Sequence, residues 1–444
     1  MVFSSQIFLF YFLPIVLIIY NLVNRRLKNL FLCIASLFFY AWGEPIYVVI
    51  MLFSTVFDFY NGIFMEKYPE HKKKILILSV VGNLGILFTF KYLGLFIASI
   101  NHLGIDLPVV NLRLPIGISF YTFQTMSYSI DVYRNRVKVS HNIIDFGLFV
   151  SSFPQLIAGP IVKYIDIEKE LESRDDSLER VGDAVFLFLK GLILKVILAN
   201  TFAEAITKID ISSSFFALLI TCVFFSLQIY YDFHGYSTMA IALGRMFGFN
   251  FPQNFNFPYS AKSITDFWSR WHISLSSWFK EYVYIPLGGN RVSVSRNIFN
   301  LFVVWALTGF WHGASYNFLL WGIYYFIILT VEKFFLSKYL TKSNRIISTI
   351  YVTAITLVGW SIFMADSTET LISYTKSFNQ LLDRNSLGVF VEYILYIIVG
   401  IFFSFPHKIK IPENIKKIAL VMLGIISIAF IISGSYNPFL YFRF

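Results

Sequence analysis

Residues 298–334 read IFNLFVVWALTGFWHGASYNFLLWGIYYFIILTVEKF, two long apolar runs separated by the small and polar stretch 312–317. A helix needs about 20 mostly apolar residues to cross the roughly 30 Å hydrocarbon core of a bilayer. Ile298–Trp311 and Phe318–Phe334 approach that length. The stretch therefore indicates two consecutive membrane spans and places lipid around much of the surface.

The composition of the whole chain supports a membrane protein. Of 444 residues, 57% are hydrophobic and 14% charged, with a mean hydropathy of +0.66. An average soluble domain carries about 25% charged residues, so this chain has too little charge to cover a soluble surface. Disordered, collagen-like, coiled-coil and disulfide-rich classes are excluded too. Cys33 and Cys222 lie in apolar runs without a CxxC neighbour, which argues against disulfides and thiolate metal sites.

We predict an all-α polytopic protein with about eleven transmembrane helices. Several are short, which indicates tilted helices or helices buried inside the bundle. The predicted spans are Ile7–Leu22, Leu30–Trp42, Ile46–Phe64, Ile75–Ile100, Ala184–Leu198, Phe215–Tyr231, Ile298–Trp311, Phe318–Phe334, Ile346–Met364, Leu387–Phe405 and Ile418–Ile432.

Basic clusters orient these spans. They are Arg25, Arg26 and Lys28; Lys67, Lys72, Lys73 and Lys74; Lys333, Lys338, Lys342 and Arg345; and Lys408, Lys410, Lys416 and Lys417. Two spans separate the first pair of clusters and two separate the second, so all four can face the cytoplasm, where basic residues concentrate. The N-terminus and residues 366–386 then lie outside. The net charge of +10 reflects this bias, and no nucleic-acid partner is expected.

Three segments are neither plain spans nor plain loops. Leu114–Val132 and Phe146–Val162 carry polar residues, glycine and proline, so each is either a re-entrant element lining a cavity or an ordinary kinked helix. Lys163–Asp183 has mixed charge and is predicted to be a solvated or interfacial helix. No internal repeat of the transporter type is visible.

His312 is the first candidate for chemistry. It lies about 21 Å along the helix that starts at Ile298, where ionisable groups usually face a cavity or another polar group. Gly309 and Gly313 leave room beside it, and Trp311 keeps it dry. Burial favours the neutral imidazole, which can accept a proton. A hydrogen bond across helices remains the alternative.

Two other histidines have polar neighbours. His272 lies in the amphipathic stretch Asp266–Phe279, which is either the roof of a cavity or an aromatic-belt helix. His234 follows Asp232 closely, which is a weak signal because near neighbours on a helix do not face each other. The three histidines lack zinc-ligand spacing, and no GxSxG, P-loop or GxGxxG motif supports another mechanism.

Six stretches together resemble the membrane-bound O-acyltransferase family, and most closely its bacterial alginate O-acetylase branch. SFYTFQTMSYSIDVYR and IPLGGNR favour that branch over the related teichoic acid D-alanyl transfer proteins. The resemblance implies one integral-membrane domain, 1–444, with short re-entrant or interfacial helices around a central funnel or tunnel. Its motif-bearing core is about 115–322 and its peripheral helices are 1–100 and 345–444. The stretches are 115–134, 153–162, 228–249, 251–291, 308–322 and 437–444.

The resemblance also implies a function. Acetyl would move from cytoplasmic acetyl-CoA toward hydroxyls of an exported cell-envelope polysaccharide such as alginate or peptidoglycan. We expect a bacterial cytoplasmic membrane protein with no bound cofactor or metal, and an extracytoplasmic acetyltransferase partner or glycan-export complex. D-alanyl transfer, a transporter for a small anion or lipid-linked sugar, and a non-catalytic scaffold are the alternatives.

In this reading His312 is the general base, and His272 orients the acceptor or donates to the oxyanion. A path from both membrane faces would narrow at His312. The expected supporting or substrate-binding residues are Arg270, Asp266, Trp268, Trp311, Asp232 and Asn256.

Overall fold

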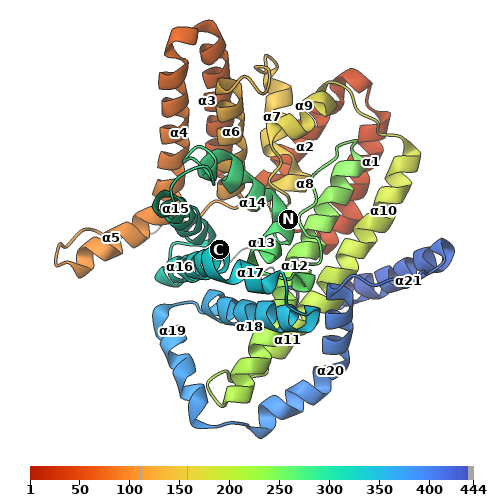
Figure 1. The fold of residues 1–444 in the computed structure, drawn as a ribbon. Helices are drawn as coiled ribbons and strands as arrows, with labels where there is room; N and C mark the ends of the chain where they lie inside the picture. Colours follow the sequence, from red (N-terminus) through yellow and green to blue (C-terminus); the bar gives the residue numbers. More distant parts are fainter. Residues whose placement is uncertain (111, 158, 439–444) are drawn as a thin grey trace. The chain divides into compact units, whose positions relative to one another are not determined.

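The computed structural model describes residues 1–110, 112–157 and 159–438. Regular structure in these residues is helical, apart from an isolated antiparallel bridge between Phe255 and Trp271 (Figure 1). The chain forms two compact units. Unit 1 comprises Met1–Leu189 and Tyr236–Pro252, and unit 2 comprises Lys190–Gly235 and Gln253–Phe444.

Unit 1 is built around three neighbouring helices, α3, α4 and α6 (Figure 1). The buried Asp58 on α3 accepts hydrogen bonds from Ser79 Oγ at 2.5 Å and Asn83 Nδ2 at 2.6 Å on α4, and from Ser129 Oγ on α6 at 3.2 Å. Such polar bonds join helices where lipid offers no hydrophobic drive for association. Its helices are η1 Phe8–Phe12, α1 Leu13–Leu22, η2 Arg25–Leu27, α2 Lys28–Gly43, α3 Val48–Lys67, η3 Pro69–His71, α4 Lys72–Leu87, η4 Phe88–Tyr92, α5 Leu93–His102, α6 Ile118–Tyr133, α7 Ile143–Ser151, α8 Phe153–Leu156, α9 Tyr164–Glu172 and most of α10 Leu178–Ile193.

The two segments that the sequence predicts to be either re-entrant elements or kinked helices differ in structure. Leu114–Val132 contains most of α6, an unbroken and almost wholly buried helix. Phe146–Val162, of which residue 158 lies outside the described residues, breaks at Ser152 between α7 and α8. Ser36 Oγ accepts a hydrogen bond from the Phe153 backbone N–H at 3.1 Å. Protein therefore satisfies the freed backbone, as a broken helix at membrane depth requires.

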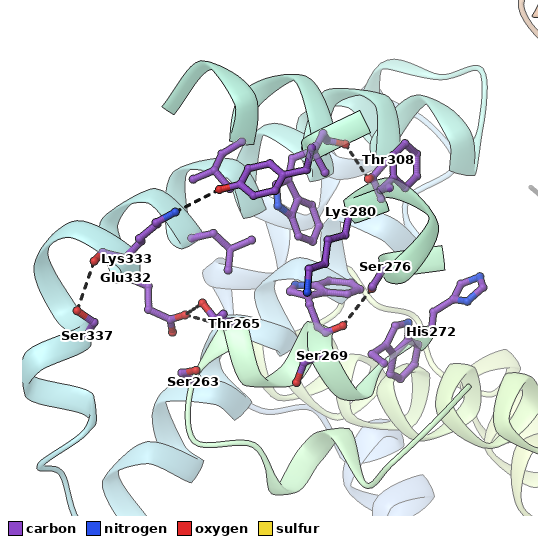
Figure 2. A pocket seen from close by; sticks show the side chains of 18 of the residues that line it. Ser263, Thr265, Ser269, His272, Ser276, Lys280, Thr308, Glu332, Lys333 and Ser337 are labelled. Atoms are coloured by element: carbon purple, nitrogen blue, oxygen red, sulfur yellow. Dashed lines mark hydrogen bonds between the residues drawn. The ribbon is translucent and has the colours of Figure 1, made fainter. Parts of the chain in front are cut away.

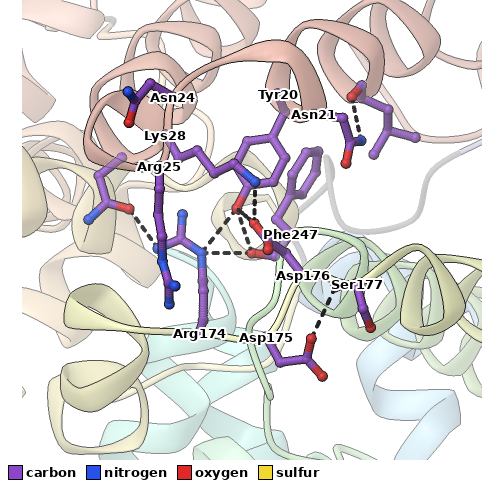
Figure 3. Close-up of polar contacts among 12 residues, drawn as sticks. Tyr20, Asn21, Asn24, Arg25, Lys28, Arg174, Asp175, Asp176, Ser177 and Phe247 are labelled. Atoms are coloured by element: carbon purple, nitrogen blue, oxygen red, sulfur yellow. Dashed lines mark hydrogen bonds and ion pairs between the residues drawn. The ribbon is translucent and has the colours of Figure 1, made fainter.

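A polar cluster fixes the segment between α9 and α10 (Figure 3). Asp176 accepts hydrogen bonds from Lys28 Nζ at 2.6 Å and Tyr20 OH at 3.0 Å. Arg174 Nε donates to the Phe247 carbonyl oxygen at 2.8 Å. Burial alone would raise the pKa of Asp176, but the hydrogen bonds from Lys28 and Tyr20 outweigh it and lower that pKa.

Unit 2 contains the helical hairpin of α15 and α16, against which α18 packs (Figure 1). Gly309 on α15 and Gly322 on α16 face each other, and a Cβ at either position would collide with a backbone carbonyl of the other helix. Small residues allow such close packing of membrane helices. Its helices are η5 Leu194–Ala199, α11 Asn200–Thr207, most of α12 Phe215–Met246, η6 Pro258–Ser260, α13 Ile264–Arg270, α14 Ile273–Phe279, η7 Lys280–Tyr284, α15 Val294–His312, α16 Tyr316–Val331, η8 Glu332–Leu336, α17 Ser337–Leu340, α18 Arg345–Met364, α19 Thr368–Ser373, η9 Tyr374–Asn379, α20 Arg384–Ser404 and α21 Glu413–Ile432.

Seven helices of the described chain are long and apolar enough to cross a membrane. They are Val48–Lys67, Pro69–His102, Phe215–Met246, Tyr316–Leu340, Arg345–Met364, Arg384–Ser404 and Glu413–Ile432. All eleven predicted spans coincide with helical segments. Four of them fall on helices that are shorter or more polar than a full span: Ile7–Leu22, Leu30–Trp42, Ala184–Leu198 and Ile298–Trp311. A multi-pass membrane protein is therefore confirmed.

Candidate active site

Unit 2 contains a cavity of about 800 Å³ lined by residues of α13, α14, α15, α16 and the turns that follow them (Figure 2). His272, His312 and Trp268 all line it. Two histidines 40 positions apart in the sequence thus open onto one cavity. The cavity is built from the short helices α13 and α14 together with the longer helices α15 and α16.

His312 is the last residue of α15. Its imidazole is half-buried among the rings of Trp311, Trp321 and Phe363, each with its centroid 5.0 Å away. The carbonyl end of a helix carries partial negative charge and stabilises a cation there. His312 therefore lies at the partly negative end of α15. Gly313 follows with an extended backbone that ends the helix.

His272 is 2% exposed and precedes α14 with a left-handed backbone, φ 44° and ψ 56°. Its Nδ1 lies 3.2 Å from Asn254 Oδ1, while its Nε2 has no hydrogen-bond partner among the described residues. The rings of Phe233 and Trp311 contact it, with centroids 4.6 and 5.8 Å away. Burial lowers the pKa of His272 to about 3, so the imidazole is neutral at physiological pH.

A short antiparallel pairing brings Asn254 to His272. The Ile273 N–H donates to the Asn254 carbonyl oxygen at 3.0 Å, and the Asn256 N–H donates to the Arg270 carbonyl oxygen at 3.0 Å. These bonds hold His272 in the left-handed conformation, which non-glycine residues adopt only when the surroundings impose it. Sequence reasoning missed Asn254 and selected Asn256, whose side chain is exposed.

Of the other predicted site residues, some lie at the cavity and some do not. Trp268 forms one wall of the cavity and packs on Trp305 and Tyr325, with ring centroids 5.0 and 4.9 Å away. Trp311 is buried between the two histidines, with its ring in contact with both. Asp266 and Arg270 form an ion pair at 2.7 Å, but neither lines the cavity.

Asp232 forms an ion pair with a buried lysine. Its carboxylate lies 2.8 Å from Lys195 Nζ, and both side chains are buried. His234 instead packs against the ring of Tyr230 on the preceding turn of α12. Neither Asp232 nor His234 lines the cavity. The described residues also contain no group of three His, Cys, Asp or Glu side chains that could hold a metal ion.

Four charged residues that line the cavity were not among the predicted site residues: Lys262, Lys280, Glu332 and Lys333. Glu332 is 2% exposed and accepts hydrogen bonds from the backbone N–H groups of Ile264 and Thr265, both at 2.7 Å. Lys333 Nζ donates to Asn290 Oδ1 at 2.6 Å and Asn297 Oδ1 at 2.7 Å. The signal was present, because a Glu-Lys pair inside the apolar run Phe318–Phe334 marks a functional position.

Fold and site together define a multi-pass helical membrane protein with a histidine-bearing cavity. The sequence pattern of MBOAT, the membrane-bound O-acyltransferase family, matches residues 34–368, and the chain belongs to this family. The predicted enzyme class, an O-acyltransferase, is thereby confirmed.

The chain also resembles named bacterial relatives. It is 33% identical to the probable alginate O-acetylase AlgI of Azotobacter vinelandii, in an alignment that covers 100% of both chains. It is 31% identical to the peptidoglycan O-acetyltransferase of Helicobacter pylori, covering 100% of this chain and 98% of the relative. The teichoic acid D-alanyltransferase of Bacillus subtilis is 29% identical over 51% of this chain and 61% of its own.

Proposed function

We propose that the protein moves acetyl groups from cytoplasmic acetyl-CoA toward the hydroxyls of an exported cell-envelope polysaccharide. The observation that carries the proposal is the cavity, which joins two histidines to a set of lysines. Lys262, Lys280 and Lys333 line it together with His272 and His312. In Figure 2, His272 and Lys333 lie at opposite sides of the cavity. One part suits acyl chemistry, and the other suits the phosphates of the donor.

The direction of the cavity supports a cytoplasmic donor. Lys333, Lys338, Lys342 and Arg345 follow α16 and form a basic cluster of the kind that stays on the cytoplasmic side. Acetyl-CoA carries several phosphate groups, which ammonium groups attract. The thioester end of such a donor would then extend from the lysines toward the histidines.

The chemistry assigned to His312 is general-base catalysis. The imidazole takes the proton of an acceptor hydroxyl as its oxygen attacks the thioester carbonyl carbon. The new C–O bond forms, the C–S bond breaks, and the proton passes from the imidazolium to the leaving thiolate. Such proton transfer typically contributes about 10²–10⁴-fold. The tryptophan walls limit water, which protects the thioester from hydrolysis.

The proposed function also requires a path to the site from both faces of the membrane and a partner outside the cytoplasm. The four predicted spans on helices that are shorter or more polar than a full span would complete about eleven membrane elements around a funnel that reaches the site from both faces. The protein would reside in the bacterial cytoplasmic membrane and hand acetyl to an extracytoplasmic transferase or glycan-export complex. Relatives named for alginate and peptidoglycan O-acetylation support this class of acceptor.

The test uses the full chain in membranes of a bacterial host that makes the acceptor glycan and its export complex, supplied with acetyl-CoA labelled in the acetyl group. Release of the CoA thiol and label on cell-envelope glycan are measured for wild type, His312→Ala and a control, His102→Ala. His102 is exposed at the end of α5. Loss of both signals in His312→Ala alone supports the proposal, whereas wild-type transfer by that variant refutes it. Turnover of a D-alanyl thioester in place of acetyl-CoA would favour the D-alanyl alternative.

A further inference from the structure

The Nε2 atom of His272 is unusual because it is buried, lines the cavity and has no hydrogen-bond partner among the described residues. Buried polar atoms normally have partners, and an orphan invites a ligand as an explanation. Whether Nε2 donates or accepts in that contact depends on which ring nitrogen carries the proton. The hydrogen-bond partner of the other ring nitrogen, Nδ1, decides which nitrogen carries the proton.

The partner of Nδ1 is Asn254, and hydrogen bonds from Ser274 fix the orientation of its side-chain amide. Asn254 Oδ1 accepts from the Ser274 backbone N–H at 3.2 Å and from Ser274 Oγ at 2.8 Å. A backbone N–H can only donate, so the amide oxygen of Asn254 must face it. The opposite amide orientation would set an NH₂ group against an N–H, donor against donor. The oxygen therefore also faces His272 Nδ1, at 3.2 Å.

We propose that Asn254 is a positioning residue that holds His272 as the neutral tautomer protonated on Nδ1, so that Nε2 accepts a hydrogen bond from a hydroxyl bound in the cavity. An oxygen acceptor opposite Nδ1 requires the proton on that nitrogen. Nε2 then presents a lone pair, as happens wherever a second partner fixes a histidine tautomer.

The tautomer decides between the two roles that the sequence left open for His272. A nitrogen without a proton cannot donate to a developing oxyanion, so His272 orients the acceptor through a second hydroxyl. The single proton of the attacking hydroxyl passes to His312. The oxyanion must find its donors elsewhere in the cavity. This assignment of roles rests on the proposed acyl transfer, whereas the tautomer itself does not.

The tautomer is tested first without any turnover. The full chain is labelled with ¹⁵N in the histidine rings and studied by solid-state NMR in lipid, with His272→Ala used to assign the His272 signals. We expect a protonated Nδ1 and an unprotonated Nε2. In Asn254→Leu the acceptor oxygen is lost and the Nδ1–H preference should disappear, while Asn254→Asp keeps an oxygen there and should restore it. A protonated Nε2 in wild type overturns the proposal, as does an unchanged tautomer in Asn254→Leu.

Turnover then separates this inference from the proposed function. Asn254→Leu should lower kcat at least about tenfold with a smaller change in KM for acetyl-CoA, since a wrong tautomer costs catalysis rather than donor binding. Asn254→Asp should recover part of kcat. Gln253→Ala is the matched control, because that neighbouring side chain is exposed and bonds to the local backbone. Wild-type kcat in Asn254→Leu refutes the positioning role, whereas wild-type transfer in His312→Ala refutes the proposed function and leaves the tautomer result standing.

Discussion

Glu332→Gln should destabilise the wall of the cavity that carries Trp268. The Glu332 carboxylate accepts the backbone N–H groups of Ile264 and Thr265, both at 2.7 Å, and the Thr265 hydroxyl at 2.5 Å. These are the first residues of α13, whose N–H groups have no partner within the helix. Glu332 thus fastens the start of α13 to the end of α16.

The magnitude follows from the chemistry of the substitution. Glutamine keeps one acceptor oxygen and replaces the other with an NH₂ group, which cannot accept. One buried N–H is then left without a partner at a cost of about 1–3 kcal/mol. The remaining bond changes from charged to neutral and weakens by about 1 kcal/mol. We expect a total loss of about 2–4 kcal/mol in the free energy of unfolding.

The assay is reversible unfolding in mixed micelles, followed by tryptophan fluorescence. Trp268 lies on α13, and the chain has 8 tryptophans, so the emission follows the unfolding of the whole chain. Glu413→Gln is the control, because Glu413 is exposed and pairs with Lys416 at 3.4 Å across one helical turn. That exposed pair should change stability by less than about 0.5 kcal/mol. The argument is wrong if Glu332→Gln matches the control within error.

Two further predictions concern pH and donor binding. The pKa of Asp176 is lower in the folded chain than in the unfolded chain. The ionised carboxylate therefore stabilises the fold above about pH 4, the ordinary aspartate range. This stabilisation is lost as the pH falls through the lowered pKa. Asp176→Asn should flatten this acid dependence in a series of Tm measurements, and an unchanged slope would contradict it. Lys280→Glu should raise KM for acetyl-CoA about tenfold with little effect on kcat, since one charged phosphate contact is worth about 1.4 kcal/mol. The exposed Lys73→Glu serves as the control, and equal KM values in both variants would exclude a donor contact at Lys280.

Some predictions succeeded because their signals are local in the chain. An apolar run of span length keeps its helical form wherever it packs, and every predicted span coincides with a helical segment. The stretch around His312 likewise encodes its own geometry, since the helix ends at the histidine and Gly313 continues in an extended conformation. Motifs of this kind identified the family before any contact was known.

Other features of the site could not be predicted because they depend on contacts between distant segments. Asn254 and Asn256 look equivalent in FPQNFNFP, and only the pairing of 254–256 with 270–273 decides which side chain reaches His272. Asp232 precedes His234 by two residues, yet its carboxylate pairs with Lys195 on another helical segment. Proximity in the sequence therefore does not identify the partner of a buried polar group.

The sequence by itself determined the membrane class, the helical segments, the family and the two cavity histidines, because hydropathy and short motifs are properties of consecutive residues. The tertiary structure alone decided which polar atoms meet: Asn254 with His272, Glu332 with the start of α13, and Lys195 with Asp232. Most buried polar atoms have a partner, and here the packing of segments that lie 18 to 68 residues apart decides which partner that is.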